Sequence, residues 1–82
     1  MPARITLYSR AGCHLCDEAR EVIEAVCAEL GEGYDELDID AEGIAPELRE
    51  RLTDEVPVTF VDGRQHDFWR VDPDRLRTAL TS

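Results

Sequence analysis

The sequence contains no lysine: its nine basic residues are all arginine, they face 19 acidic residues, and the net charge is −10. A surface this short of positive charge repels phosphate backbones and anionic lipid headgroups. No apolar run approaches the roughly 20 residues that span a bilayer, and the N-terminus lacks the apolar stretch of a secretory signal. We therefore expect no nucleic-acid partner, no membrane partner and a cytoplasmic location.

The chain is also short, and it has few cysteines. Its 82 residues hold one domain (residues 1–82) with one modest core, and the 43% hydrophobic content is typical of a folded protein. We expect it to act as a monomer. Three cysteines in a reducing compartment do not indicate a disulfide framework; a close pair indicates redox or metal chemistry.

Apolar periodicity predicts the elements of the first half. Ile5–Tyr8 alternates β-branched and aromatic residues and predicts a strand. From about His14 to Leu30 apolar residues recur at helical spacing, and the glycines that follow end this helix. Tyr34–Asp40 alternates, with Leu37 and Ile39 apolar, which is typical of a half-buried strand whose acidic side is tolerable at a sheet edge.

The second half begins with a short helix from Pro46 to about Leu52, because proline fits the first helical turn. Two strands follow, Val58–Val61 and Arg64 to about Trp69. Asp62-Gly63 between them predicts a tight hairpin turn, since both residues can adopt positive φ.

A last helix is predicted from Pro73, with Asp72 as its N-cap and with inward-facing Leu76, Ala79 and Leu80. The element order is then β-α-β-α-β-β-α. The helix between the first two strands makes those strands parallel, and the late hairpin is antiparallel.

The most informative motif is the C-x-x-C pair Cys13 and Cys16 at the start of the long helix. The first N–H groups of a helix lack partners and carry partial positive charge, so a thiolate at Cys13 is stabilised there. Arg10 and a protonated His14 would add positive charge and are candidates for tuning this ionisation; His14 is equally compatible with an exposed loop histidine. Cys16 lies one turn further along, on the same side, and should be more buried.

Such a pair predicts thiol–disulfide exchange, in which Cys13 attacks a substrate disulfide and Cys16 then resolves the mixed disulfide. The alternative is half of a zinc site, which needs four ligands. Cys27 lies roughly 15 to 20 Å from Cys13 along the helix, so we expect no metal. Cys27 itself is predicted to be a small buried hydrophobe.

Val56-Pro57 precedes the third strand, and the base rate of about 5–6% for cis X-Pro bonds gives no reason to expect one here. Taken together, however, the chain resembles the thioredoxin superfamily, and most of all the short bacterial glutaredoxin-like proteins. The matching residues are Tyr8-Ser9-Arg10, Gly12-Cys13-His14-Leu15-Cys16, Asp38-Ile39-Asp40, Val56-Pro57-Val58, Asp62-Gly63 and Asp72.

This resemblance implies an α/β, three-layer thioredoxin-like fold with a four-stranded mixed sheet. It also implies that Pro57 is cis and lies beside Cys13, and that the backbone of Val56 pairs with the substrate chain like an added strand. Glutaredoxins usually have Pro-Tyr between the cysteines and Gly-Gly after the fourth strand, followed by an acidic residue that holds the amino end of glutathione. Here His14-Leu15 and Phe68-Trp69-Arg70-Val71 take those places, with Asp72 next.

Trp69 could line a substrate groove, but packing over the last helix is the favoured interpretation, because large aromatic residues are mostly buried. With Trp69 kept as a candidate for the groove, the predicted substrate-binding residues are Val56, Pro57, Trp69 and Asp72.

The resulting prediction is a dithiol oxidoreductase that reduces protein disulfides or mixed disulfides of low-molecular-weight thiols. No cofactor is expected to be bound; electrons would come from glutathione, another small thiol or a reductase. Two alternatives stay open: a binding or redox-sensing module without turnover, and an iron–sulfur carrier.

Overall fold

The computed structural model describes residues 3–81, and its elements follow the predicted order. They are β1 (Ile5–Ser9), α1 (His14–Leu30), β2 (Tyr34–Asp38), α2 (Pro46–Leu52), β3 (Val58–Val61), β4 (Arg64–Phe68) and α3 (Pro73–Thr81). Only strand ends differ from the prediction: β1 includes Ser9, while β2 and β4 stop at Asp38 and Phe68. Across residues 3–81, no helix is both long enough and apolar enough to cross a bilayer.

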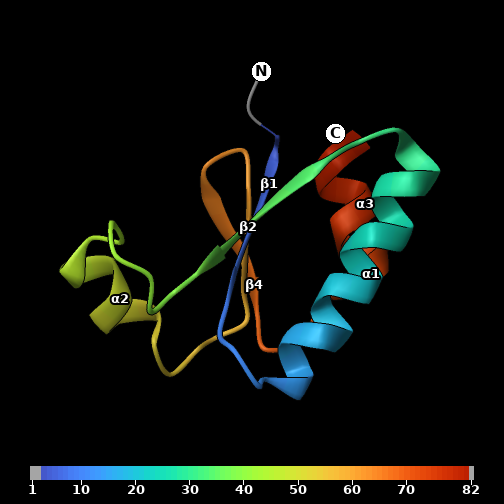
Figure 1. The fold of residues 1–82 in the computed structure, drawn as a ribbon. Coiled ribbons are helices and arrows are strands. Elements are labelled where there is room, and N and C mark those ends of the chain that lie inside the picture. Colours follow the sequence, from blue (N-terminus) through green and yellow to red (C-terminus); the bar gives the residue numbers. More distant parts are fainter. Residues whose placement is uncertain (1–2, 82) are drawn as a thin grey trace.

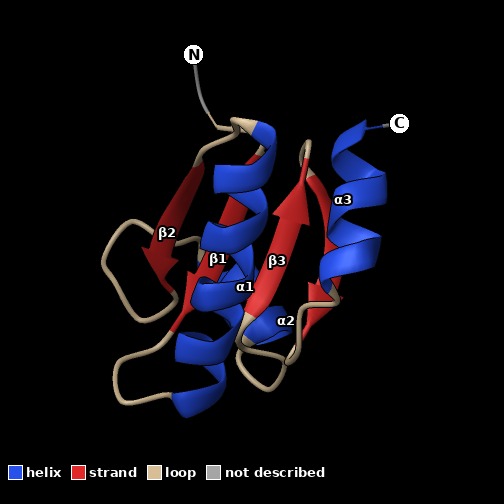
Figure 2. Cartoon of the chain, turned by 90° about the vertical axis from the view of Figure 1, so that its right-hand side faces the viewer, coloured by secondary structure: helices blue, strands red, loops and turns tan. Residues whose placement is uncertain are grey.

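The sheet has the strand order β2-β1-β3-β4. β1 and β2 are parallel and β3 and β4 are antiparallel, as predicted. The structure adds the antiparallel pairing of β1 with β3, which joins the two halves of the sheet. Helices α1 and α3 cover one face of this sheet and α2 lies on the other, which gives three layers (Figures 1 and 2). β1 therefore lies inside the sheet and carries the chain into α1 at one end of it.

Two hydrophobic cores hold these layers together. The larger lies between the sheet and the two helices α1 and α3, where Ile5, Leu7, Ile23 and Leu76 have no exposed surface. The smaller core lies under α2 and contains Ile39, Leu52 and Val58. Cys27 is 6% exposed within the larger core, which confirms its predicted role as a small hydrophobe.

The predicted stop and start signals are confirmed. Gly31 ends α1 with φ of 70°, a left-handed conformation that favours glycine. Asp62 and Gly63 both have positive φ, 53° and 81°, at the β3–β4 turn. The carboxylate of Asp72 accepts hydrogen bonds from the N–H groups of Asp74 and Arg75, at 2.9 and 3.3 Å, and so caps α3.

The prediction of a half-buried β2 was wrong for Leu37. β2 is an edge strand, and Leu37 is 41% exposed. Its partner in the neighbouring strand is Tyr8, which packs against the smaller core. The seven-residue α2 is too short to cover that whole face, so Leu37 stays in solvent, whereas Ile39, just after the strand, is fully buried.

Replacing Ile23 by Ala should lower the free energy of unfolding by about 2–5 kcal/mol, because the side chain is fully buried and its loss leaves a cavity. Urea unfolding followed by circular dichroism measures this. Glu21→Ala, at an exposed position of the same helix, is the matched control and should change stability by no more than about 0.5 kcal/mol. Equal effects of the two changes would show that α1 does not pack as described.

Candidate active site

Cys13 occupies the N-cap position of α1, immediately after the loop that leaves the end of β1. Its backbone is extended, with φ of −101° and ψ of 112°, and the helix begins at the next residue. The N–H group of Cys16 donates a hydrogen bond to Cys13 Sγ at 3.1 Å. The first sulfur of the motif therefore receives one of the unpaired N–H groups at the positive end of the helix.

Cys16 lies one turn into α1 and is 1% exposed, whereas Cys13 is half-buried. Burial is the main cause that raises the pKa of Cys16 to about 12, and a side-chain hydrogen bond between the Cys16 thiol and Cys13 adds to the shift. The backbone of Arg10 and the charge of Arg20 act in the opposite direction. The two thiols are not bridged in this structure.

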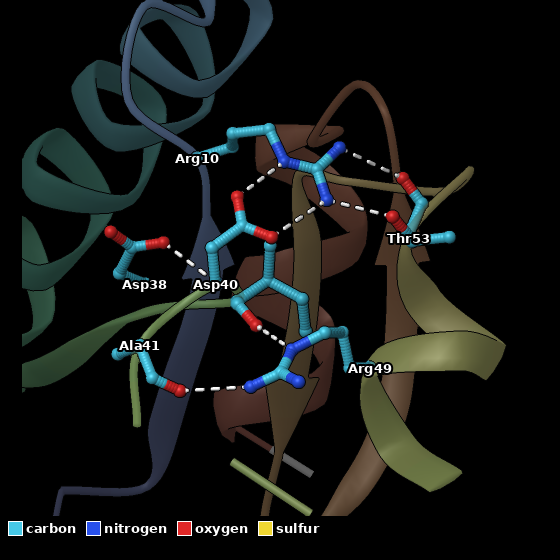
Figure 3. Close-up of polar contacts among 7 residues, drawn as sticks. Arg10, Asp38, Asp40, Ala41, Arg49 and Thr53 are labelled. Atoms are coloured by element: carbon cyan, nitrogen blue, oxygen red, sulfur yellow. Dashed lines mark hydrogen bonds and ion pairs between the residues drawn. The ribbon is translucent and has the colours of Figure 1, made fainter. Parts of the chain in front are cut away.

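Arg10 is the first residue of the loop between β1 and α1 (residues 10–13, the redox loop), but its side chain is bonded to the β2–α2 loop and the end of α2. The guanidinium donates to both carboxylate oxygens of Asp40, at 2.8 and 3.3 Å, and to the hydroxyl and carbonyl oxygens of Thr53, at 2.7 and 3.3 Å (Figure 3). The pKa of Arg10 is raised, first by its hydrogen bonds to Asp40 and least by the charge of Cys13. No local pattern in the sequence indicates these partners, which lie 30 and 43 residues from Arg10 along the chain.

A second arginine, Arg20 of α1, belongs to a network of hydrogen bonds that no pattern in the sequence predicts. It donates to the two carboxylate oxygens of Glu36 at 2.7 and 2.6 Å and to Asp17 at 2.8 Å. Glu36 in turn accepts the hydroxyl of Ser9 at 2.7 Å. These hydrogen bonds, chiefly those from Arg20, hold the pKa of Glu36 below its usual range.

The Val56–Pro57 peptide bond is cis, as the resemblance implies. Tyr8 is paired with Val58 in the antiparallel β1–β3 ladder, so Pro57 lies beside the end of β1, where the redox loop begins. The side chain of Pro57 is fully buried. Within residues 3–81, the backbone N–H and C=O groups of Val56 take part in no hydrogen bond.

Trp69 does not pack in the core, so the favoured interpretation of this residue was wrong. It is 51% exposed, and its φ of 62° turns the chain out of β4. Its backbone N–H donates to the carbonyl of Pro57 at 2.7 Å, and its indole N–H donates to the carbonyl of Asp54 at 3.0 Å. Trp69 therefore lies against the α2–β3 loop, with the exposed ring of Phe68 in an edge contact at 5.1 Å.

The remaining candidates have simpler surroundings. His14 is exposed at the first position of α1. Asp72 uses its carboxylate to cap α3. In the described part of the chain, no group of three or more His, Cys, Asp or Glu residues is arranged to hold a metal ion.

A mixed sheet between two helical layers, with a dithiol at a helix N-terminus beside a cis-proline, defines a thioredoxin-like protein. Residues 4–81 match the family model described as "glutaredoxin-like domain (DUF836)". The chain belongs to this glutaredoxin-like family, and the predicted thioredoxin-like α/β fold is confirmed. Membership indicates thiol–disulfide redox chemistry.

Proteins of similar sequence or structure come from several organisms. An uncharacterized protein of Mycobacterium tuberculosis is 37% identical over 81 residues, covering 94% of this chain and 81% of the relative. A structural genomics target from X. campestris has a TM-score of 0.72 at 33% identity, covering 94% of this chain and 95% of that one. The glutaredoxin of Archaeoglobus fulgidus has the same fold, with a TM-score of 0.62 at 18% identity over 98% of this chain and 88% of that one.

Iodoacetamide added to the reduced protein at neutral pH should alkylate Cys13 and leave Cys16 and Cys27 as thiols. Burial limits access to the latter two and is the main cause that raises the pKa of each, so both stay protonated. Mass spectrometry of a tryptic digest measures the modified fraction at each cysteine. In denaturant all three should react; alkylation of Cys16 in the folded protein as fast as that of Cys13 would contradict the assigned order.

Proposed function

We propose that the protein is a dithiol oxidoreductase in which Cys13 is the nucleophile and Cys16 the resolving thiol. The observation that carries the proposal is the hydrogen bond from the Cys16 N–H to Cys13 Sγ at the N-terminus of α1. Backbone N–H groups and the dipole of a 17-residue helix stabilise negative charge on that sulfur. The thiolate is the species that attacks a disulfide.

In the first step the Cys13 thiolate attacks one sulfur of a substrate disulfide. A new S–S bond forms between Cys13 and the substrate, the substrate's own S–S bond breaks, and its second sulfur leaves as a thiolate that takes a proton from solvent. The products are a mixed disulfide on Cys13 and one free thiol. Because Cys13 is half-buried and Cys16 is buried, only Cys13 can reach the substrate disulfide and attack it.

In the second step Cys16 loses its proton to solvent and attacks Cys13 Sγ, which releases the other half of the substrate as a thiol. Formation of the mixed disulfide itself prepares this step. After burial, two causes raise the pKa of Cys16: the side-chain hydrogen bond to Cys13 and the negative charge of Cys13. Both are lost once Cys13 is bound to substrate, so the pKa of Cys16 falls. The protein ends with a Cys13–Cys16 disulfide, having passed two electrons to the substrate.

The substrate chain is proposed to lie along Val56. The N–H and C=O groups of Val56, which are unpaired within residues 3–81, lie next to Pro57 and beside the end of β1. They can form the hydrogen bonds of a short added strand with the substrate. Trp69, which follows β4, adds exposed aromatic surface against the α2–β3 loop. Asp72, three residues after Trp69, fixes the start of α3. A small thiol such as glutathione, or a reductase, returns the protein to its dithiol form.

Replacing Cys13 by Ser should abolish reduction of insulin and of hydroxyethyl disulfide, because the nucleophile is lost. Cys16→Ser should instead stop after the first step and accumulate a mixed disulfide, visible by mass spectrometry. Cys27→Ser is the matched control, since this thiol is buried in the main core, and it should retain activity. Full activity of the Cys13 variant would refute the proposed nucleophile.

Replacing Trp69 by Ala should raise KM for a protein disulfide roughly five- to tenfold while kcat and the rate with hydroxyethyl disulfide stay nearly unchanged, because exposed aromatic surface anchors protein partners. The KM of Trp69→Phe for the protein disulfide should lie between that of the wild-type protein and that of Trp69→Ala. Leu37→Ala removes another exposed apolar side chain, on the edge strand β2, and should leave KM unaltered. Equal loss with both substrates would indicate damage to the loop rather than a docking role.

A further inference from the structure

The guanidinium of Arg10 is the cation nearest in sequence to the redox motif, and almost all of its hydrogen-bonding capacity is used inside the protein. A guanidinium has five N–H donors, and four hydrogen bonds lead from this one to Asp40 and Thr53. The Asp40 carboxylate is met by a fork of two donors, which is the strong geometry for an arginine–carboxylate pair. One N–H donor remains, so a substrate carboxylate could be held by a fork of two donors only by displacing Asp40 or Thr53.

Asp40 is itself held in place by the segments around it. Its N–H donates to the carboxylate of Asp38 at 2.9 Å. Arg49 of α2 donates to the carbonyls of Ile39 and Ala41, one on each side of Asp40, at 3.0 Å each (Figure 3). Thr53, the other partner of Arg10, ends α2. The acceptors that take up Arg10 are thus built into two fixed segments.

The other arginines near the dithiol are also paired with carboxylates. Arg20 is bonded to Glu36 and Asp17, and Arg70 lies 3.4 Å from Glu18 in an exposed pair. A hollow of about 380 Å³ beside the redox loop is lined by Arg10 and Arg20 together with Asp17, Glu36 and Asp38.

Two carboxylates close in sequence to the partners of Arg10 have no cation within ion-pair distance among the described residues. Within residues 3–81, Asp38 at the hollow and Asp54 in the α2–β3 loop form no ion pair. The surroundings of Cys13 therefore offer little free positive charge and some uncompensated negative charge.

We propose that Asp40 and Thr53 determine specificity by taking up the guanidinium of Arg10, so that the site favours disulfides with neutral or positively charged groups over disulfides that carry carboxylates. This inference rests on the proposed dithiol function and names its substrate class. It assigns Asp40 and Thr53 as positioning residues, because they act through Arg10.

The test compares three disulfides of similar size: cystamine, which carries ammonium groups; hydroxyethyl disulfide, which is neutral; and dithiodiglycolate, which carries carboxylates. Each is added to the reduced protein in a single turnover, in which Cys13 and Cys16 are oxidised to a disulfide and the reagent is reduced to two thiols. Acid quenching and mass spectrometry give the rate. Each rate is divided by that of dithiothreitol with the same reagent, which removes intrinsic differences in reactivity.

In the wild-type protein the normalised rate should fall from cystamine to hydroxyethyl disulfide to dithiodiglycolate. The differences should shrink in about 1 M salt, where the screening length is about 3 Å. Asp40→Asn should raise the ratio of dithiodiglycolate to hydroxyethyl disulfide about three- to tenfold, because it releases a full positive charge beside the redox loop. A purely structural role of Asp40 would instead change all three rates alike.

The matched control is Asp38→Asn, which removes the same charge from the same segment but accepts no hydrogen bond from Arg10. It should shift the ratio clearly less than Asp40→Asn. Thr53→Val changes no charge and removes one acceptor of Arg10, so it should shift the ratio in the same direction by a smaller factor. It also serves as the test if Asp40→Asn does not fold.

The outcomes separate the two proposals. If the wild-type protein oxidises with none of the three disulfides, the proposed function fails. Two other outcomes would leave the dithiol function standing and overturn the role of Asp40 and Thr53. In the first, the wild-type protein reacts with all three disulfides and the rate ratios do not depend on charge. In the second, Asp40→Asn and Asp38→Asn shift the rate ratios equally and Thr53→Val does not shift them.

Discussion

The hydrogen bond from the Cys16 N–H to Cys13 Sγ is the interaction on which the site depends. It exists because β1 ends at Ser9 inside the sheet and α1 begins at His14, so that Cys13 falls at the N-cap. Ile23 and Val26 anchor α1 against the sheet in the larger core. The position of one sulfur at the positive end of a helix is therefore set by packing more than two turns away.

Ion pairs between distant segments hold the loops around that sulfur. Arg10 joins the redox loop to the β2–α2 loop and to the end of α2, and Arg20 joins α1 to β2. Each arginine uses several donors, a geometry that lysine lacks. The basic residues of this chain are all arginine, and these ion pairs both hold the loops of the site in place and neutralise its positive charge.

The proposed substrate side of the site combines backbone groups of Val56, which are unpaired within residues 3–81, with the exposed ring of Trp69. Val56 keeps free backbone groups beside the cis-proline, and Trp69 keeps half of its surface in solvent against the same loop. Exposed apolar surface and unpaired strand backbone are typical of sites that bind other chains. With the paired arginines, they are the basis of the proposal that the substrate is peptide-like and poor in carboxylates.

Local patterns in the sequence determined the element order, the caps at Gly31 and Asp72, the hairpin turn at Asp62-Gly63 and the placement of Cys13 and Cys16 at the start of α1, because each depends on residues close together in the chain. The parallel pairing of β1 and β2 followed from the helix between them, since a strand–helix–strand unit brings its two strands parallel. Only the tertiary structure decided that Arg10 meets Asp40 and Thr53, that Trp69 lies outside the core and that Leu37 is exposed. These contacts join residues as many as 43 positions apart, or depend on how far a short helix covers a sheet face. A single sequence carries the periodicity of each element, but not the distances between elements once they have packed.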